Sequence, residues 1–416
     1  MQSIKTYWQK LESWWFPLSM LALWMNVLGL FLSARALMSM GMIGFSICAV
    51  AMPNLGARVK TLWHDKQALG LMACTALPLL SFFWSQNTAY WFERAQIMIP
   101  CLVLPAMFSL YRAPHYRWVD YWKTTWIIAS VFGMGFSVWQ YLQHKESIDA
   151  AYGFAKHMPT PFKNDHIRFS LAVCISIMFC VERAIKKQTV LWGSIAFIAV
   201  VYLHWLSAKS GLVALYGMAF FAIAYFMVQA KYRKPALMAL LFFTALPVLM
   251  YQVSTPFKNK IGYFLYSLEQ MQNNQVQAQV SDEGRLISYR FALQHIQAHP
   301  LIGVGLGDVY DTMQADYQQH VGGNQAGPSL LPHNQFLMSA MSAGLFTIPI
   351  WLWTLFLLWK EEGQGKIMRR FFWGLVFFAM MIEPLFETQY GVSVFLVVGL
   401  LLRPTYASGD EELLPR

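Results

Sequence analysis

The chain has 416 residues, of which 57% are hydrophobic and only 12% are charged. Soluble proteins carry about twice that charged fraction, and a globule of this composition in water would expose a large apolar surface. Lys and Arg outnumber Asp and Glu by 31 to 21. The composition therefore indicates an integral membrane protein and excludes a soluble enzyme.

Twelve apolar runs have the length of a membrane-spanning helix, which needs about 17–25 residues. An even number of spans would place both ends of the chain on one side, so we expect an all-α polytopic membrane protein with about 12 transmembrane helices. The runs lie near residues 16–34, 36–54, 68–84, 95–111, 121–142, 167–182, 189–206, 211–229, 235–252, 334–359, 371–386 and 388–402.

The basic residues predict the orientation of these spans. With a cytoplasmic N-terminus, 20 of the 31 Lys and Arg residues lie on the cytoplasmic side, mostly in short connecting loops. This distribution follows the positive-inside rule, and the inverted orientation does not. Membrane topology therefore explains most of the basic excess, and we expect membrane lipids but no nucleic acid as partners.

Two segments on the outer side are too long to be simple turns, and loops of this length are usually functional. One covers about residues 143–166, and the other, 253–333, is the sizeable soluble portion. The predicted organisation is transmembrane helices 1–9 in 1–252, an outer loop domain in 253–333, transmembrane helices 10–12 in 334–402, and a cytoplasmic tail in 403–416.

The large outer loop has a recognisable internal pattern. From Gly284 to Ala298 apolar residues recur at helical spacing, and His299-Pro300 ends the predicted helix. A glycine-rich run from Gly303 to Gly307 then indicates turns. The polar stretches Gln270 to Gln279 and His320 to Gly327 are predicted to be flexible.

Four ionisable residues fall at or near the outer boundary: Arg168, Lys209, Arg285 and His333. Converging cations would suit a diphosphate anchored by a lipid tail, since Arg is a bidentate phosphate donor and Lys a point charge. Each cation taken alone also fits an interfacial residue whose charged end reaches the water. A neutral His333 could act as a general base, or it could simply cap the helix that follows.

Other ionisable residues have more ordinary interpretations. Glu383 and Glu387 fall near the outer end of the eleventh run, where a carboxylate is costly, so we expect each to pair with one of those cations. Glu93-Arg94 is interpreted as a local ion pair. His295 and His299 have a spacing that could bind a metal, but without an evident third ligand we expect no metal site.

Several short motifs, in order along the chain, resemble those of the O-antigen ligase/polymerase family, of the lipid A-core:surface polymer ligase type. The resemblance covers about residues 160–400. Its motifs are Ala208-Lys209-Ser210-Gly211-Leu212, Gly284-Arg285-Leu286 with Tyr289, His299-Pro300-Leu301-Ile302-Gly303-Val304-Gly305-Leu306-Gly307, His333-Asn334-Gln335-Phe336-Leu337 with Gly344-Leu345, and Glu383 with Glu387 and Gly391.

The resemblance implies a GT-C-like fold and glycosyl transfer at the periplasmic face of the bacterial inner membrane. The implied donor is a glycan on undecaprenyl diphosphate, and the implied acceptor is a sugar hydroxyl of lipid A-core or another glycan. The reaction would be inverting and would need no cofactor or metal. Carried over by position, His333 would activate the acceptor and Arg285 would hold the diphosphate. Arg168 and Lys209 would assist Arg285, and the supporting residues would be Asn334, Glu383, Glu387 and Arg290.

One position departs from the family pattern, because Lys209 stands where the family usually has Arg. The charge is kept but the bidentate fork is lost, so either Lys209 suffices or Arg168 supplies the second phosphate contact. The motifs also fit a polymerase of lipid-linked glycan or a protein O-oligosaccharyltransferase. A lipid-glycan transporter or flippase is the alternative from another class, although such proteins tend to have repeated halves and charges near the membrane midplane.

Overall fold

The computed structural model describes residues 2–111, 116–154, 156–187, 189–272, 281–321, 331–363 and 365–404, and all regular structure within them is helical. The all-α class predicted from composition is thereby confirmed. The α-helices are α1 (Gln2–Phe31), α2 (Arg35–Ala51), α3 (Leu55–Leu62), α4 (Lys66–Leu80), α5 (Thr88–Leu110), α6 (Tyr116–Gln143), α7 (Lys145–Tyr152), α8 (His166–Lys187), α9 (Val190–Leu206), α10 (Lys209–Met227), α11 (Arg233–Val253), α12 (Thr255–Gln272), α13 (Ser281–Ala298), α14 (Val309–Val321), α15 (Gln335–Ala343), α16 (Thr347–Lys360), α17 (Lys366–Ile382), α18 (Gln389–Gly391) and α19 (Val398–Leu401). Short 3₁₀ turns occur at η1 (Ser81–Phe83), η2 (Ala230–Tyr232) and η4 (Leu385–Glu387), and a π-helical stretch at η5 (Val392–Val397).

Several of these helices have the dimensions of a membrane span. Within the described residues, five stretches are long and apolar enough to cross a bilayer: Trp14–Phe31, Lys66–Phe83, Thr88–Leu110, Lys209–Met227 and Ala230–Val253. The bent pair α2 and α3, with 113° between its members, would make a sixth. Each of the twelve predicted runs is largely helical, and the count of twelve spans stays a prediction.

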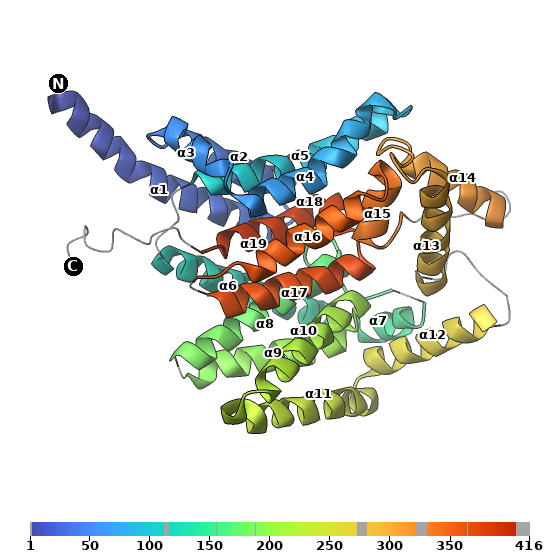
Figure 1. Ribbon diagram of the computed structural model, residues 1–416. Helices are drawn as coiled ribbons and strands as arrows, with labels where there is room; N and C mark the ends of the chain where they lie inside the picture. Colours follow the sequence, from blue (N-terminus) through green and yellow to red (C-terminus); the bar gives the residue numbers. More distant parts are fainter. Residues whose placement is uncertain are drawn as a thin grey trace.

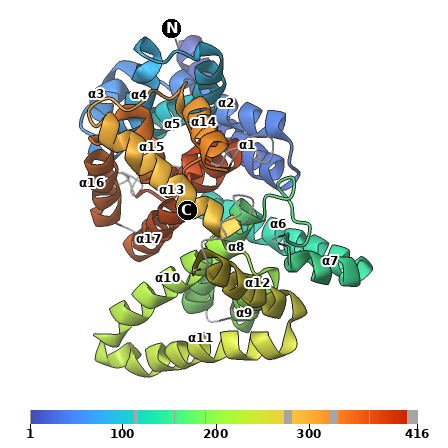
Figure 2. The ribbon, with the colours of Figure 1, turned by 90° about the vertical axis from the view of Figure 1, so that its right-hand side faces the viewer.

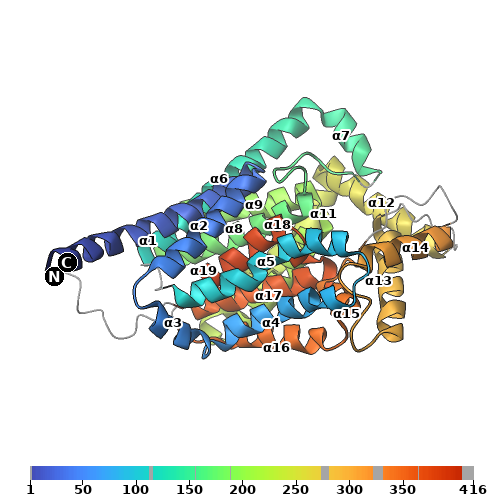
Figure 3. The ribbon, with the colours of Figure 1, turned by 90° about the horizontal axis from the view of Figure 1, so that it is seen from above.

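The helices form an elongated bundle with two distinct ends (Figure 1). The helices α7, α12, α13 and α14 gather at one end, here called the loop end, while α3 and the start of α1 lie at the opposite, far end (Figure 3). Viewed from the loop end, α13 crosses the middle of the molecule, between α4 and α5 on one side and α9 to α11 on the other (Figure 2). The helices of the two predicted outer segments thus lie together at the loop end.

Two predicted spans differ from the helices observed. The run 334–359 is not one helix, because α15 stops at Ala343 and α16 begins at Thr347. Gly344 between them has a φ of +93°, and a Cβ there would lie 2.1 Å from the carbonyl oxygen of Leu301. Only glycine fits such a position, so the run is divided where Gly344 passes close to Leu301.

The run 371–386 is also interrupted near its outer end. Helix α17 ends at Ile382, and Glu383 is extended, with φ −147° and ψ 143°. Pro384 follows, and a residue before proline is disfavoured in the helical conformation. Glu383 therefore lies just beyond the helix and not within it.

Helices occur in both segments predicted to lie on the outer side, and their outer location stays a prediction. The helix predicted over 284–298 is confirmed as α13, and the predicted loop 143–166 contains the short helix α7. Most of the two polar stretches, residues 273–279 and 322–327, lies outside the described residues, as do residues 405–416 of the predicted tail.

The glycine-rich run after α13 connects two parts of the fold. On one side it binds the end of α15, where Val304 N donates to Met341 O (2.8 Å). On the other side Leu306 N donates to Ser81 Oγ (2.8 Å), next to the turn between α4 and α5. A Cβ on Gly307 would lie 2.5 Å from the carbonyl oxygen of Asn87, so this close approach requires glycine.

Asp308 completes this attachment. Its carboxylate accepts hydrogen bonds from the main-chain N–H groups of Gln86 (2.9 Å) and Asn87 (2.8 Å). Helix α13 and the end of α15 are therefore fixed to the turn between α4 and α5 by contacts on both sides of the glycine run.

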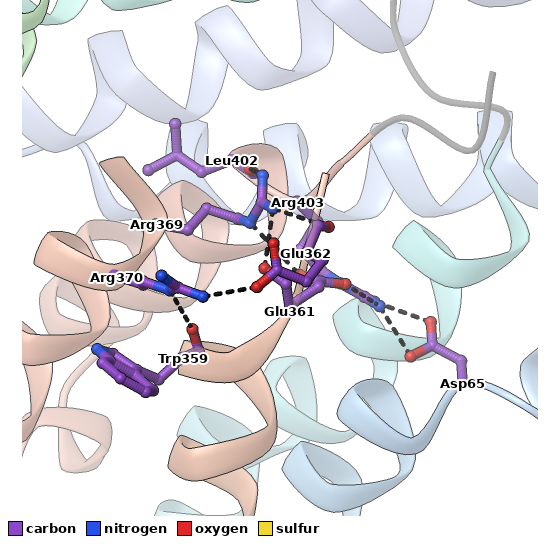
Figure 4. Close-up of polar contacts among 8 residues, drawn as sticks. All are labelled: Asp65, Trp359, Glu361, Glu362, Arg369, Arg370, Leu402 and Arg403. Atoms are coloured by element: carbon purple, nitrogen blue, oxygen red, sulfur yellow. Dashed lines mark hydrogen bonds and ion pairs between the residues drawn. The ribbon is translucent and has the colours of Figure 1, made fainter. Parts of the chain in front are cut away.

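A cluster of ion pairs closes the far end (Figure 4). Arg403 makes a two-pronged contact with Asp65, at 2.8 and 2.9 Å, and lies 3.1 Å from Glu361. Arg369 is 3.7 Å from the same Glu361. These residues join the start of α4, the end of α16, the start of α17 and the end of α19, at the opposite end of the bundle from α13 and α14.

Candidate active site

The candidate site begins with His333, which immediately precedes α15. Asn334 caps this helix, since its side-chain oxygen accepts from Phe336 N (2.8 Å) and Leu337 N (3.1 Å). The cap fixes the main chain beside His333, and Tyr289 Oη donates to the carbonyl oxygen of His333 (2.7 Å). The imidazole keeps 21% of its side-chain surface exposed, so a second molecule can reach it.

Glu383 faces the imidazole from the segment after α17. Its Oε2 lies 3.2 Å from Nδ1 of His333, and the glutamate is fully buried. With Nδ1 directed at a carboxylate, the favoured neutral tautomer carries its proton there and leaves the lone pair on Nε2. This is the arrangement that a histidine general base requires.

The other oxygen of Glu383 binds two further elements. Arg285 Nη2 on α13 lies 2.7 Å from Oε1, and Ser210 Oγ at the start of α10 donates to the same atom (3.0 Å). Burial opposes ionisation of this carboxyl, but the hydrogen bond from His333 and the charge of Arg285 hold its pKa below the usual value. Glu383 is therefore an anion that holds a histidine and an arginine side by side.

Arg168 approaches the same segment from the first turn of α8. Its Nη2 is 3.5 Å from the carbonyl oxygen of Pro384, and Nη1 is 3.5 Å from Asp165. Both contacts are long, and the buried Nε has no hydrogen-bond partner. Arg168 thus has N–H groups to spare for an anionic ligand.

Lys209 and Arg290 are placed less directly. Lys209 is the first residue of α10, and its Nζ lies 4.7 Å from the ring centre of Phe264, while the neighbouring Ser210 contacts Glu383. Arg290 is exposed on α13. Five residues beyond Arg285, it is rotated by about 140° around the helix, away from Glu383.

The expected partners of Glu387 and Arg94 require correction. Glu387 does not pair with Arg168, Lys209 or Arg285; its Oε2 lies 2.5 Å from Nη2 of Arg94. Arg94 therefore does not form the local pair expected with Glu93, which is exposed. The reason is burial, because an arginine that is only 8% exposed needs an equally buried carboxylate.

His295 also has a partner that its sequence neighbours do not suggest. Its Nε2 lies 2.5 Å from Asp316 Oδ2 on α14. The pair joins α13 to α14, and no group of three or more potential metal ligands occurs within the described part of the chain.

Two histidines near the site did not stand out in the sequence. His157 and His166 stack with ring centres 3.7 Å apart at the start of α8. Burial lowers the pKa of both, that of His166 to about 4, and the nearby Lys260 lowers both further. Both rings therefore stay neutral beside the basic residues of the loop end.

The fold and this cluster define a class: an all-helical protein with multiple apolar helices and a polar, cationic site where the helices end. Residues 194–352 match the family model described as O-antigen ligase, and this match supports the resemblance found in the sequence. The match includes Lys209, Arg285 and His333, whereas Arg168 and Glu383 lie outside it. No curated protein matches the chain.

Proposed function

We propose that this protein is a membrane glycosyltransferase of the O-antigen ligase type. It would move a glycan from undecaprenyl diphosphate to a sugar hydroxyl of lipid A-core at the periplasmic face of the inner membrane. The observation that carries the proposal is the pairing of His333 Nδ1 with Glu383 directly beside Arg285, which gives a base and a phosphate ligand to one site.

The proposed reaction is a single displacement at the anomeric carbon of the donor sugar. Nε2 of His333 takes the proton of the acceptor hydroxyl as its oxygen forms the new bond to that carbon. The bond to the diphosphate oxygen breaks at the same time, and inversion follows because attack and departure occur on opposite faces. The buried carboxylate of Glu383 stabilises the imidazolium that results.

The departing diphosphate collects negative charge, which cations can stabilise. Arg285 and Arg168 are proposed to hold it, with Arg168 as the second phosphate ligand because its N–H groups are under-used. Lys209 adds positive charge at the first turn of α10, where a helix N-terminus also favours an anion. In this proposal the three cationic side chains supply the charge stabilisation that a Lewis acid could otherwise provide.

The acceptor decides between the members of this reaction class. The purified full-length protein would be incubated in detergent with one undecaprenyl-diphosphate glycan and, in parallel, with lipid A-core, with excess donor alone, or with an acceptor protein. Product on lipid A-core supports the ligase, longer lipid-linked glycan indicates a polymerase, and glycosylated protein indicates a protein transferase. If none of the three incubations gives product, and the protein reconstituted into vesicles moves the donor from one leaflet to the other, transport would replace transfer as the function.

A further inference from the structure

A second buried ion pair lies next to the His333–Glu383 pair. We infer that Arg94, acting through Glu387 and Gln335, is a positioning residue that sets the distance between His333 and Glu383. This inference rests on the proposed function, in which His333 is the base.

The first step is the pair of contacts between Arg94 and the segment that carries Glu383. From α5, Nη2 of Arg94 contacts both the carboxylate of Glu387 (2.5 Å) and its main-chain carbonyl oxygen (2.7 Å). The two side chains are only 10% and 5% exposed. One cation therefore fixes both the side chain and the backbone four residues after Glu383.

The second step is the link from that segment to the helix that follows His333. Gln335 is the first residue of α15, two residues after His333, and is 1% exposed. Its Oε1 accepts from Phe386 N (2.9 Å), and its Nε2 lies 3.5 Å from Glu387 Oε1. The two chain segments that carry His333 and Glu383 are thus joined a second time, by the hydrogen bonds of Gln335 a few residues further along.

The third step is the packing that makes this junction rigid. The Trp351 ring of α16 stacks on Phe386, with centres 5.2 Å apart and planes at 14°. Its Nε1 donates to Ser339 Oγ on α15 (3.0 Å). Movement of the Glu387 segment would therefore disturb α15 and α16 together.

The energetics favour a role in geometry over a role in net stability. Taking two charges out of water costs nearly as much as their attraction returns, so a buried pair can often be replaced by apolar residues without loss of stability. What such a replacement loses is the fixed direction of the contacts. Catalysis is sensitive to that loss, because a misplacement of about 1 Å can cost about 100-fold in rate.

The test uses the purified full-length protein in the transfer assay, with Arg94→Met, Glu387→Met, the double Met variant and Arg94→Lys. We expect kcat to fall about 10-fold or more in Arg94→Met while KM for the donor changes less than twofold. Arg94→Lys should recover part of kcat. The double variant buries no unpaired charge and should fold even where a single variant does not, yet its kcat should stay low.

A matched control lies at the far end, where Arg403 and Asp65 form a pair of similar burial, 8% and 4% exposed. Arg403→Met should lower the melting temperature but leave kcat per folded molecule unchanged. A second control places Arg94→Met in a Glu383→Gln background, where it should lower kcat less than twofold further because the partner it positions is already lost.

Wild-type kcat in the folded double variant would overturn the inference, as would an undiminished effect of Arg94→Met in the Glu383→Gln background. A fully active His333→Ala would instead remove the proposed function itself. An inactive His333→Ala together with unchanged kcat in Arg94→Met would refute the positioning role alone.

Discussion

Glu383 makes the contacts that bring the site together at the scale of single residues. Its two oxygens bind His333, Arg285 and Ser210, which come from three different parts of the chain. Sequence reasoning could predict that a carboxylate near a membrane boundary needs a partner. It could not choose among the cations, because the choice depends on which helix ends meet at the loop end.

The proposed phosphate role of Arg285 gives a prediction with a control on the same helix. Arg285→Gln should weaken donor binding about 10- to 100-fold, since hydrogen bonds to charged groups contribute about 1.5–3 kcal/mol. Arg290→Gln, which removes the same charge from an exposed position, should change affinity less than twofold. Binding of a labelled polyprenyl diphosphate measures both, and equal losses in the two variants would reduce the role of Arg285 to net charge.

The stacked histidines give a pH dependence. His166 has its ordinary pKa of 6.5 in the unfolded chain, whereas burial lowers the pKa to about 4 in the folded protein. Between about pH 6.5 and pH 4 the unfolded chain therefore binds a proton at His166 that the folded chain excludes. Stability should therefore decline as the pH falls through that window and then level off with respect to this group. Thermal unfolding in detergent should show a smaller decline for His166→Phe, which keeps the stack with His157. Parallel curves for the two proteins would contradict the shift.

At the scale of elements, the glycine run after α13 acts as an attachment between separate parts of the fold. The sequence predicts turns there from Gly303, Gly305 and Gly307, and the structure has them, two with positive φ. What the sequence could not supply is the partner surface, the turn at residues 81–87. Asp308, which binds that turn, directly follows the glycine run. An acid at that position is the sequence feature that could have indicated an attachment to main-chain N–H groups.

Gly307→Ala tests this attachment. The added methyl group would lie 2.5 Å from the carbonyl oxygen of Asn87, so the turn must move away, at a cost of about 1–3 kcal/mol. Gly262→Ala on α12 adds the same methyl group into open space and should be neutral or slightly stabilising. Melting temperatures of the two variants provide the comparison. A loss that is equal in both would show that the close approach does not matter.

The breaks in the helices are the features of the elements that the sequence did not predict. Apolar length alone predicted a single span over 334–359, whereas Gly344 divides it because its neighbour Leu301 leaves no room for a side chain. Helix type and helix position follow from local periodicity, and α13 was predicted on that basis. Breaks that depend on contact with a distant segment do not follow from it.

At the scale of the whole molecule, the two ends of the bundle have different chemistry. The far end carries the ion pairs of Asp65, Glu361, Arg369 and Arg403, while the loop end carries the cluster around Glu383. The predicted orientation places the far end in the cytoplasm, as its basic residues require.

Cysteine labelling tests this orientation against a low background, because all five native cysteines are buried. Gln294→Cys, exposed on α13 at the loop end, should react with a membrane-impermeant maleimide in intact bacteria whose outer membrane admits the reagent. Lys366→Cys at the far end should react only after the inner membrane is opened. Labelling of Lys366→Cys before Gln294→Cys would invert the topology.

The most direct test of the central claim is the rate of glycan transfer by His333→Ala, measured with purified protein, the lipid-linked donor and whichever acceptor yields product in the parallel incubations. Removal of a positioned base costs about 10²- to 10⁴-fold, so transfer should fall by at least 100-fold. Donor binding and the melting temperature should stay close to those of the wild type. Transfer at the wild-type rate would contradict the assignment of His333 as the base and, with it, the account of this site.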